Sequence, residues 1–266
     1  MKIPIYHVDA FAVEPFKGNP AAVCILQAPR SAEWMQNVAA EMGLSETAFL
    51  LAKGEGYNLR WFTPKTEVDL CGHATLASAH ILYEFGFYEP DEKIAFYTLS
   101  GTITASFTNG TIELDMPRRN PVPQPVTPEI VAVLGQTPRA AATYADQILL
   151  AELESPEAVR SFVPDWKKIA LLPQADLIIT APCTEKYDFV SRFFSPQTGI
   201  YEDPVTGMAH CMLAPYYAEQ LHKTKFHAYQ ASPRGGEVWV RLGEDRAYIG
   251  GKAVTVSQGE LLHQKD

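Results

Sequence analysis

The expected architecture rests on two stretches of sequence that resemble one another. The first is Phe62-Thr63-Pro64-Lys65-Thr66, followed by Cys71-Gly72-His73-Ala74, and the second is Phe194-Ser195-Pro196-Gln197-Thr198, followed by Thr206-Gly207-Met208-Ala209. Each copy predicts the end of a strand, a loop that contains proline, and a small-residue step into a helix. Eight residues separate Pro64 from Gly72, and eleven separate Pro196 from Gly207. The repetition predicts an internal duplication, with two similar lobes around a cleft.

The segments around the two copies follow a similar order of expected elements. In the first half, the pattern predicts strands at residues 3–11, 20–26, 47–51 and 57–62 and helices at 33–43 and 72–86. In the second half, it predicts a helix at about 206–221 followed by further strands. Because the proline-rich residues 117–128 discourage regular structure, we place the boundary between the lobes near residue 117.

Composition and charge exclude several classes of protein. A chain of 266 residues that is 47% hydrophobic and 20% charged is long enough for one large core or two ordinary ones. Its net charge of −9 has the wrong sign for neutralising phosphates, so we expect no nucleic-acid partner. No apolar run approaches the roughly 20 residues that span a bilayer, so we expect no membrane insertion.

The N-terminal residues and the cysteines indicate a cytoplasmic protein. The first nine residues lack the apolar core of a signal peptide. The four cysteines, Cys24, Cys71, Cys183 and Cys211, show no C-x-x-C spacing, which gives only weak support for a zinc site. In a reducing compartment we expect these thiols to stay unbridged.

The two predicted helix starts offer a place for an anion. If both helices point their first turns into a shared cleft, their unpaired backbone N–H groups converge on one spot. Such a spot binds a carboxylate or another anion. The alternative is that Gly72 and Gly207 only permit close packing of the helices.

Four titratable residues are candidates for the chemistry of the site. Glu46 stands where an apolar strand begins, and partial burial there would raise its pKa and suit it to proton transfer; the alternative is a solvated glutamate. His73 lies in the first turn of the first helix, where the dipole favours a neutral imidazole. Asp203 precedes the second helix and could instead brace the turn before Pro204. Asp9 lies in an apolar strand and is expected to brace a loop first and to touch substrate second.

Several motifs in their order resemble the phenazine-biosynthesis PhzF-like isomerase family. These motifs are Asp9-Ala10-Phe11, Gly18-Asn19-Pro20, Ser45-Glu46-Thr47-Ala48-Phe49, Cys71-Gly72-His73-Ala74-Thr75, Asp203-Pro204-Val205-Thr206-Gly207 and the C-terminal Gly250-Gly251-Lys252-Ala253. Together they extend over nearly the whole chain.

The resemblance implies an α/β (α+β) fold of the diaminopimelate epimerase-like type. Such a fold has two pseudo-symmetric lobes, each a curled, mostly antiparallel sheet around a central helix. The last strand, about residues 252–266, is then expected to rejoin the N-terminal lobe of residues 1–117. Residues 118–251 form the C-terminal lobe, and the active site lies in the cleft.

The resemblance also implies a site and a reaction. Glu46 is expected to move a proton between carbons of a small carboxylate-bearing substrate, with His73 and Asp203 holding the substrate and assisting. The substrate-binding residues would be Gly72, Gly207, Met208, Asn19 and Asp9. No metal or organic cofactor is implied, and a homodimer is expected. Many family members carry a small serine where this chain has Met208, which argues against the phenazine-pathway substrate.

Two other functions stay open at this point. One is a racemase or epimerase of the same fold that uses two facing cysteines as acid and base. Cys71 occupies a fitting place for it, but Asp203 stands in the matching loop and Cys211 comes four residues after Gly207. The other is a non-catalytic protein that binds small carboxylates.

Overall fold

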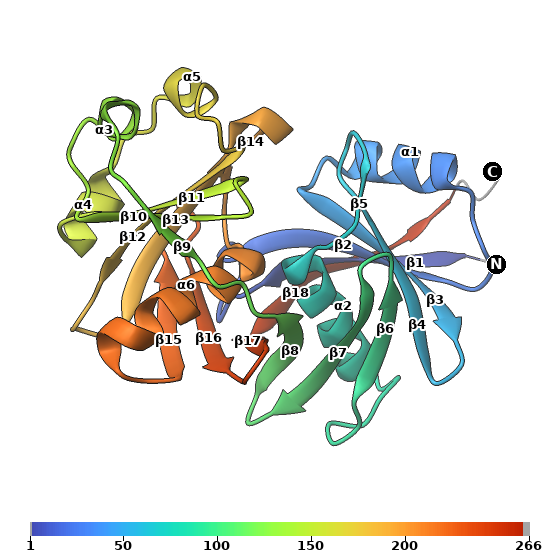
Figure 1. Cartoon of the computed structure of the whole chain (residues 1–266). Coiled ribbons are helices and arrows are strands. Elements are labelled where there is room, and N and C mark those ends of the chain that lie inside the picture. The colour runs from blue at the N-terminus through green and yellow to red at the C-terminus, as the bar shows by residue number, and fades with distance from the viewer. Residues whose placement is uncertain (1, 263–266) are drawn as a thin grey trace. The chain divides into compact units, whose positions relative to one another are not determined.

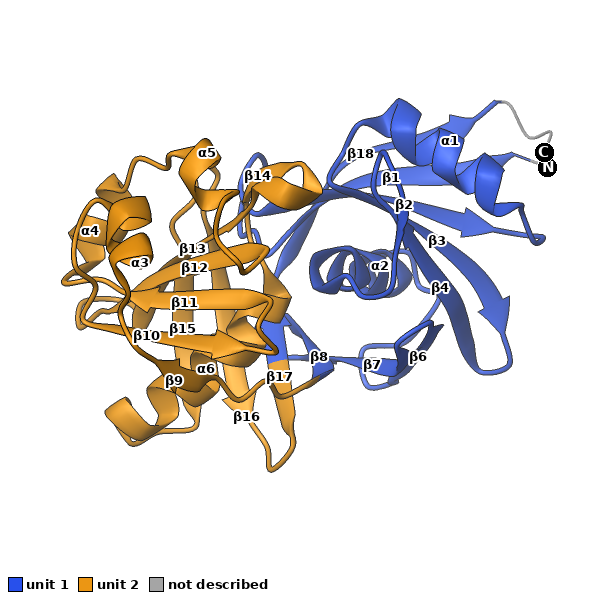
Figure 2. Cartoon of the chain, turned by 45° about the horizontal axis from the view of Figure 1, so that its top comes forward, with its two compact units in different colours: residues 1–116, 249–266 blue, residues 117–248 orange. Residues whose placement is uncertain are grey.

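The computed structural model describes residues 2–262 and divides them into two compact units (Figures 1 and 2). Unit 1 comprises the residues up to Met116 and those from Ile249 onward, and unit 2 comprises Pro117–Tyr248. The chain therefore leaves unit 1 where the proline-rich stretch begins. None of the helices in residues 2–262 has the length and apolar character that a transmembrane helix needs.

Unit 1 is a curved sheet around one buried helix. Its strands are β1 (Ile3–Ala10), β2 (Asn19–Leu26), β3 (Glu46–Lys53), β4 (Gly56–Phe62), β5 (Glu67–Val68), β6 (Ile94–Thr98), β7 (Gly101–Thr108), β8 (Thr111–Pro117) and β18 (Ala253–Leu261), and its helices are α1 (Ala32–Met42) and α2 (Gly72–Glu84). The sheet curls around α2, which Figure 2 shows inside it. Helix α1 lies on the other face, where Trp34 and Met35 pack with Phe49 and Phe62.

The strand order of unit 1 brings distant segments together. The strands lie in the order β18-β1-β2-β3-β4-β6-β7-β8, and all neighbours are antiparallel except β2 with β3 and β4 with β6. The last strand, β18, pairs antiparallel with the first strand, β1. Each parallel pair needs a crossover, and the crossovers contain α1 and α2.

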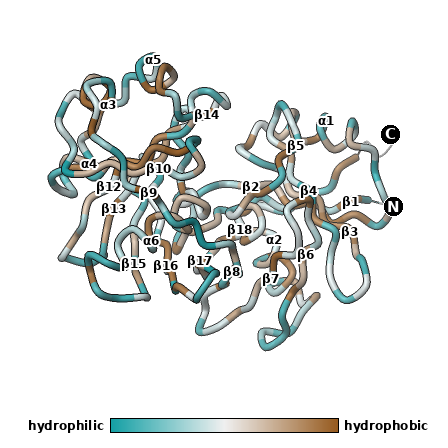
Figure 3. The backbone as a smooth tube through the Cα atoms, in the orientation of Figure 1, coloured by the Kyte–Doolittle hydropathy of each residue, from teal (hydrophilic) through white to brown (hydrophobic). Residues whose placement is uncertain are grey.

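Unit 2 is built from the remaining elements. Its strands are β9 (Val122–Gln124), β10 (Ala140–Tyr144), β11 (Ile148–Glu152), β12 (Asp176–Pro182), β13 (Phe189–Ser195), β14 (Ile200–Asp203), β15 (Lys225–Gln230) and β16 (Gly236–Leu242), and β17 (Arg246–Gly251) leads back to unit 1. The helices are α3 (Pro128–Leu134), α4 (Pro156–Ser161), α5 (Trp166–Ile169) and α6 (Gly207–Leu221), with a 3-10 turn at Pro196–Thr198. Hydrophobic residues concentrate along the central strands and hydrophilic ones in the loops (Figure 3).

The internal duplication predicted from the sequence is confirmed by the strand pairing. In unit 2, β10 and β11 are antiparallel, β11 and β12 parallel, β12 and β13 antiparallel, β13 and β15 parallel, and β15 and β16 antiparallel. The pairs from β1 to β7 show the same alternation in unit 1. Helix α6 thus holds the same place in the order as α2. The predicted fold class, two similar lobes each with a curled sheet and a central helix, is confirmed.

The repeat includes a pair of side-chain contacts. Arg60 of β4 forms a bidentate ion pair with Glu67 of β5, with two N–O distances of 2.7 Å. Arg192 of β13 forms the same pair with Glu202 of β14, at 2.7 and 2.9 Å. These ion pairs fix the short strands that lead into α2 and α6. The arginines at both places also stack on the phenylalanine two residues later, at 5.1 Å from the ring centre.

The sequence did not predict strand β10. Its residues, Ala140-Ala141-Ala142-Thr143-Tyr144, contain three alanines, which have low strand propensity. They form a strand because β9 and β11 pair with them on both sides. Tertiary pairing therefore overrides local propensity in this segment.

The two arginines make a matched test of burial. The side chain of Arg192 is 8% exposed and also donates to the backbone oxygens of Val159 and Phe162, whereas that of Arg60 is 29% exposed. We expect Arg192→Met to lower the free energy of unfolding by about 3–5 kcal/mol, because Glu202, whose side chain is only 12% exposed, loses its partner. Arg60→Met should cost only about 1 kcal/mol. Urea denaturation checks this, and equal losses would contradict it.

Candidate active site

Glu46 is the first residue of β3, at the point where this strand enters the sheet of unit 1. The parallel register places it opposite Ala21 of β2. The residue is only 8% exposed, although it carries a carboxylate. A buried carboxylate needs a partner because the loss of hydration is costly.

That partner is His73, in the first turn of α2. Its Nε2 lies 3.1 Å from Oε2 of Glu46, and the residue is 5% exposed. Apart from this ion-pair contact, neither atom has a hydrogen-bond partner within the described protein. Both atoms therefore have unused hydrogen-bonding capacity in a buried place.

The other ring nitrogen of His73 is held by two neighbours. Nδ1 lies 3.1 Å from Nδ2 of Asn19 and 3.6 Å from Sγ of Cys71. Asn19 is fully buried and follows Gly18, whose φ of +64° and contact with the oxygen of Ala10 leave no room for a side chain. The geometry gives Asn19 a positioning contact with His73, whereas the sequence placed it among the substrate-binding residues.

The charge state of His73 differs from the sequence-based expectation. Burial by itself lowers the pKa of the imidazole, but Cys71 and the carboxylate of Glu46 raise this pKa well above its ordinary value. This shift is opposite to the one that the helix start alone predicts, because the neighbouring Cys71 and Glu46 outweigh a helix-start effect of about 0.3–1 kcal/mol. Burial, followed by the charge of Glu46, raises the pKa of the Cys71 thiol, which stays protonated at neutral pH.

The start of α2 also offers backbone donors. Its N-cap residue is Cys71 in an extended conformation, and no side chain caps the first turn. The N–H groups of Gly72 and His73 belong to the turn that has no intrahelical acceptors. In unit 1, a carboxylate and an imidazole thus adjoin the positive end of a buried helix.

Unit 2 contains the second group of predicted residues. Asp203 ends β14 and is 8% exposed, and its Oδ2 accepts a hydrogen bond from the hydroxyl of Thr206. Gln230 donates to the backbone oxygen of Asp203 at 2.7 Å and accepts from the backbone nitrogen of Thr206 at 2.9 Å. No role was predicted for Gln230, whose only signal in the sequence is a polar residue on the buried side of a strand, in line with Phe226 and Ala228.

The remaining predicted residues divide between the units. Asp9 is 1% exposed and its Oδ2 accepts from the backbone nitrogen of Phe16 at 2.7 Å, which is the loop-bracing contact expected first. In unit 2, Gly207 is buried and Met208 is half-buried at the start of α6, where no side chain caps the helix. A site shared by Glu46 and Asp203 stays a prediction.

Cys211 does not have the position that a two-cysteine mechanism needs within the repeat. It lies inside α6, where its Sγ contacts the backbone oxygen of Gly207 at 3.6 Å and burial raises the pKa of its thiol to about 12. The counterpart of Cys71, one residue before the helix, is Thr206. Unit 2 therefore has no cysteine at the repeated position.

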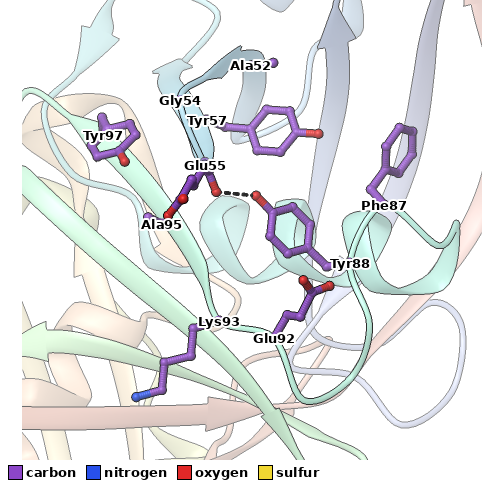
Figure 4. A pocket seen from close by; sticks show the side chains of 11 residues that line it. Ala52, Gly54, Glu55, Tyr57, Phe87, Tyr88, Glu92, Lys93, Ala95 and Tyr97 are labelled. Atoms are coloured by element: carbon purple, nitrogen blue, oxygen red, sulfur yellow. Dashed lines mark hydrogen bonds between the residues drawn. The ribbon is translucent and has the colours of Figure 1, made fainter.

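A separate surface pocket of about 760 Å³ lies against the β3–β4 turn of unit 1 (Figure 4). Tyr57, Tyr88 and Tyr97 line it together with Glu55 and Glu92. The hydroxyl of Tyr88 donates to the backbone oxygen of Glu55 at 2.7 Å, the dashed line in Figure 4. No predicted site residue lines this pocket, so it is separate from the candidate active site at Glu46 and His73.

Comparison with known proteins identifies the family. The family model described as phenazine biosynthesis-like protein matches residues 8–259. An uncharacterized isomerase of Halalkalibacterium halodurans is 49% identical, over 98% of this chain and 99% of that protein. This chain belongs to the phenazine biosynthesis-like family. The resemblance inferred from the motifs is confirmed.

Solved structures support the same assignment. A phenazine biosynthesis protein of the PhzF family from Enterococcus faecalis superposes with a TM-score of 0.94 at 42% identity, over 99% of this chain and 100% of the other. A hydroxyproline epimerase from Agrobacterium vitis is only 10% identical and has a TM-score of 0.65, over 98% of this chain and 92% of the other. The second likeness concerns the fold alone.

The raised pKa of His73 can be tested directly. We expect its imidazole to titrate at a much higher pH than that of His210, whose pKa burial lowers to about 4. In Glu46→Gln the pKa of His73 should fall because the opposite charge is gone. NMR titration of the histidine ring nitrogens measures both residues, so His210 is the internal control. An unchanged His73 pKa in the variant would contradict this coupling.

Proposed function

We propose that this protein is an isomerase that needs no cofactor and moves a proton between carbons of a small carboxylate-bearing substrate. One observation carries the proposal. The buried Oε2 of Glu46 and Nε2 of His73 lie 3.1 Å apart, and beyond this contact neither has a hydrogen-bond partner within the described protein. Unsatisfied buried polar atoms are costly, and a bound substrate would relieve that cost. A relative that is 49% identical is named an isomerase, which supports the class of reaction.

The proposed reaction assigns each group in unit 1 a step. The carboxylate of Glu46 takes a proton from a carbon next to the substrate's conjugated system, so the C–H bond breaks and its electron pair moves into that system. The protonated Glu46 then gives the proton to another carbon, where a new C–H bond forms. Charge that develops on the substrate carboxylate is stabilised by the backbone N–H groups of Gly72 and His73. Asn19 holds the imidazole in place through Nδ1.

The residues of unit 2 enter the proposal as assisting groups. Asp203 is proposed to aid proton transfer, and Gly207 and Met208 to contribute helix-start amides. The hydrogen bonds from Thr206 and Gln230 keep the Asp203 segment in one conformation, which suits a positioned catalytic group. The half-buried Met208 side chain would exclude substrates that fill the space beside a smaller residue.

Epimerisation is the second candidate. It requires the proton to return to the same carbon from the opposite face, which calls for a second acid. The Cys71 thiol stays protonated at neutral pH but lies within 4.8 Å of Glu46, on the same side of the substrate, so this reaction would need an acid from another part of the chain. The position of an isotopic label separates this reaction from a proton shift.

The test uses deuterated water and a small-metabolite extract, so it does not depend on a guessed substrate. We expect the parent protein to introduce deuterium into a small carboxylate. Glu46→Gln should introduce it at least about 100-fold more slowly. Asp203→Asn should also slow it. Mass spectrometry measures the label, and its position on the carbon skeleton identifies the reaction.

Asp176→Asn is a matched control, because Asp176 begins β12 of the second repeat as Glu46 begins β3. This variant should keep its rate within a few-fold of the parent. Label that persists in Glu46→Gln would remove Glu46 as the base. Binding of the carboxylate without label in the parent protein would favour the non-catalytic alternative.

A further inference from the structure

Three different metal-ligating side chains meet at the start of α2. A carboxylate oxygen of Glu46, Sγ of Cys71 and a ring nitrogen of His73 all lie within 4.8 Å of one another, and all three residues are buried. The proton shift proposed above uses Glu46 and His73 but leaves the Cys71 thiol without a role. A buried thiol beside an imidazole and a carboxylate is a donor set that zinc prefers.

We propose that Glu46, Cys71 and His73 bind a thiophilic divalent cation such as Zn²⁺, and that the bound ion blocks the site. The ion would act as an inhibitor and not as a cofactor. Metal binding itself does not depend on the proposed reaction. Only the inhibition rests on the proposed function, because the ion would occupy the carboxylate and the imidazole that the proton shift needs.

The spacing of the donor atoms fits a tetrahedral ion. With a Zn–S bond of about 2.3 Å and a Zn–N bond of about 2.0–2.1 Å, a sulfur and a nitrogen ligand lie about 3.5 Å apart. Sγ of Cys71 and Nδ1 of His73 are 3.6 Å apart, so these two atoms can share an ion, which would replace the Asn19 contact at Nδ1. Oε2 of Glu46 lies 3.1 Å from Nε2, the other ring nitrogen, and within 4.8 Å of the cluster, so the Glu46 side chain must rotate towards Nδ1 to reach the ion.

The unused hydrogen-bonding capacity of the cluster points to a ligand at the same place. Glu46 and His73 are more than nine-tenths buried, and apart from the 3.1 Å contact with Nε2 of His73, Oε2 of Glu46 has no hydrogen-bond partner in the described protein. A divalent cation would satisfy this oxygen. Three protein ligands leave a fourth position for water, as in zinc sites that are open on one side.

Charge and proton balance make the binding pH-dependent. Coordination forms a metal–sulfur bond and breaks the S–H bond of Cys71, and the thiol proton leaves for the solvent. The coordinating imidazole nitrogen must also be free of its proton. The ligands then carry two negative charges, one on Glu46 and one on Cys71, which match the charge of the ion. Affinity should therefore rise with pH, and Mg²⁺ or Ca²⁺, which prefer oxygen ligands, should not compete.

Cobalt is the probe for the test, because Co²⁺ takes zinc sites and a thiolate ligand gives it a strong near-ultraviolet absorption band. We expect the reduced, chelator-treated full chain to bind one equivalent of Co²⁺ with this band, and Zn²⁺ to displace it. Cys71→Ser should lose the band. Cys183→Ser is the matched control, because Cys183 is a buried cysteine of unit 2, and it should keep the band.

A second variant covers the case in which Cys71→Ser does not fold. Glu46→Gln keeps the thiol but loses a charged ligand, so its Co²⁺ affinity should fall at least about tenfold. The proposal is overturned if the parent protein shows no thiolate band, or if Cys71→Ser or Glu46→Gln binds Co²⁺ as the parent does. The readout is independent of turnover: failure to transfer deuterium leaves the band unaffected, and failure to bind cobalt leaves the deuterium test valid.

Discussion

The burial of Glu46 beside His73 is the constraint on which the site depends. A carboxylate that is 8% exposed is stable only with compensating charge and donors nearby. The imidazole supplies the charge at 3.1 Å, and the uncapped start of α2 supplies the field of the helix. Asn19 fixes the ring from its other side, because Gly18 lets β2 begin close to β1. The fold thus holds a reactive pair in place before any substrate arrives.

The repeat gives both units the same architecture, but the residues at their helix starts differ in chemistry. In both units a bidentate arginine–glutamate ion pair holds a short strand, and the helix that follows begins with glycine. At matching positions, unit 1 has Cys71 and His73, whereas unit 2 has Thr206 and Met208. The strand pairing and the ion pairs therefore give both units the same fold, while the residues at the helix starts differ.

More of the fold than of the site could be predicted from the sequence. The repeated motifs and the two Ala-containing segments predicted α2 and α6, because helical patterns of that length are strong local signals. Strand β10 was missed, since its alanines form a strand only through pairing on both sides. The effect of Glu46 on the pKa of His73 and the role of Gln230 could not be predicted, because both depend on contacts between residues 24 or more positions apart.

The central claim is that Glu46 and His73 form the place where a carboxylate-bearing substrate reacts. The most direct test is a crystal structure of Glu46→Gln bound to the carboxylate that gains deuterium from the parent protein. The account predicts that the reacting carbon lies about 3–3.5 Å from the side chain of residue 46, with the carboxylate at the amides of Gly72 and His73. A ligand bound instead in the pocket beside Tyr88, with the site at His73 unoccupied, would contradict it.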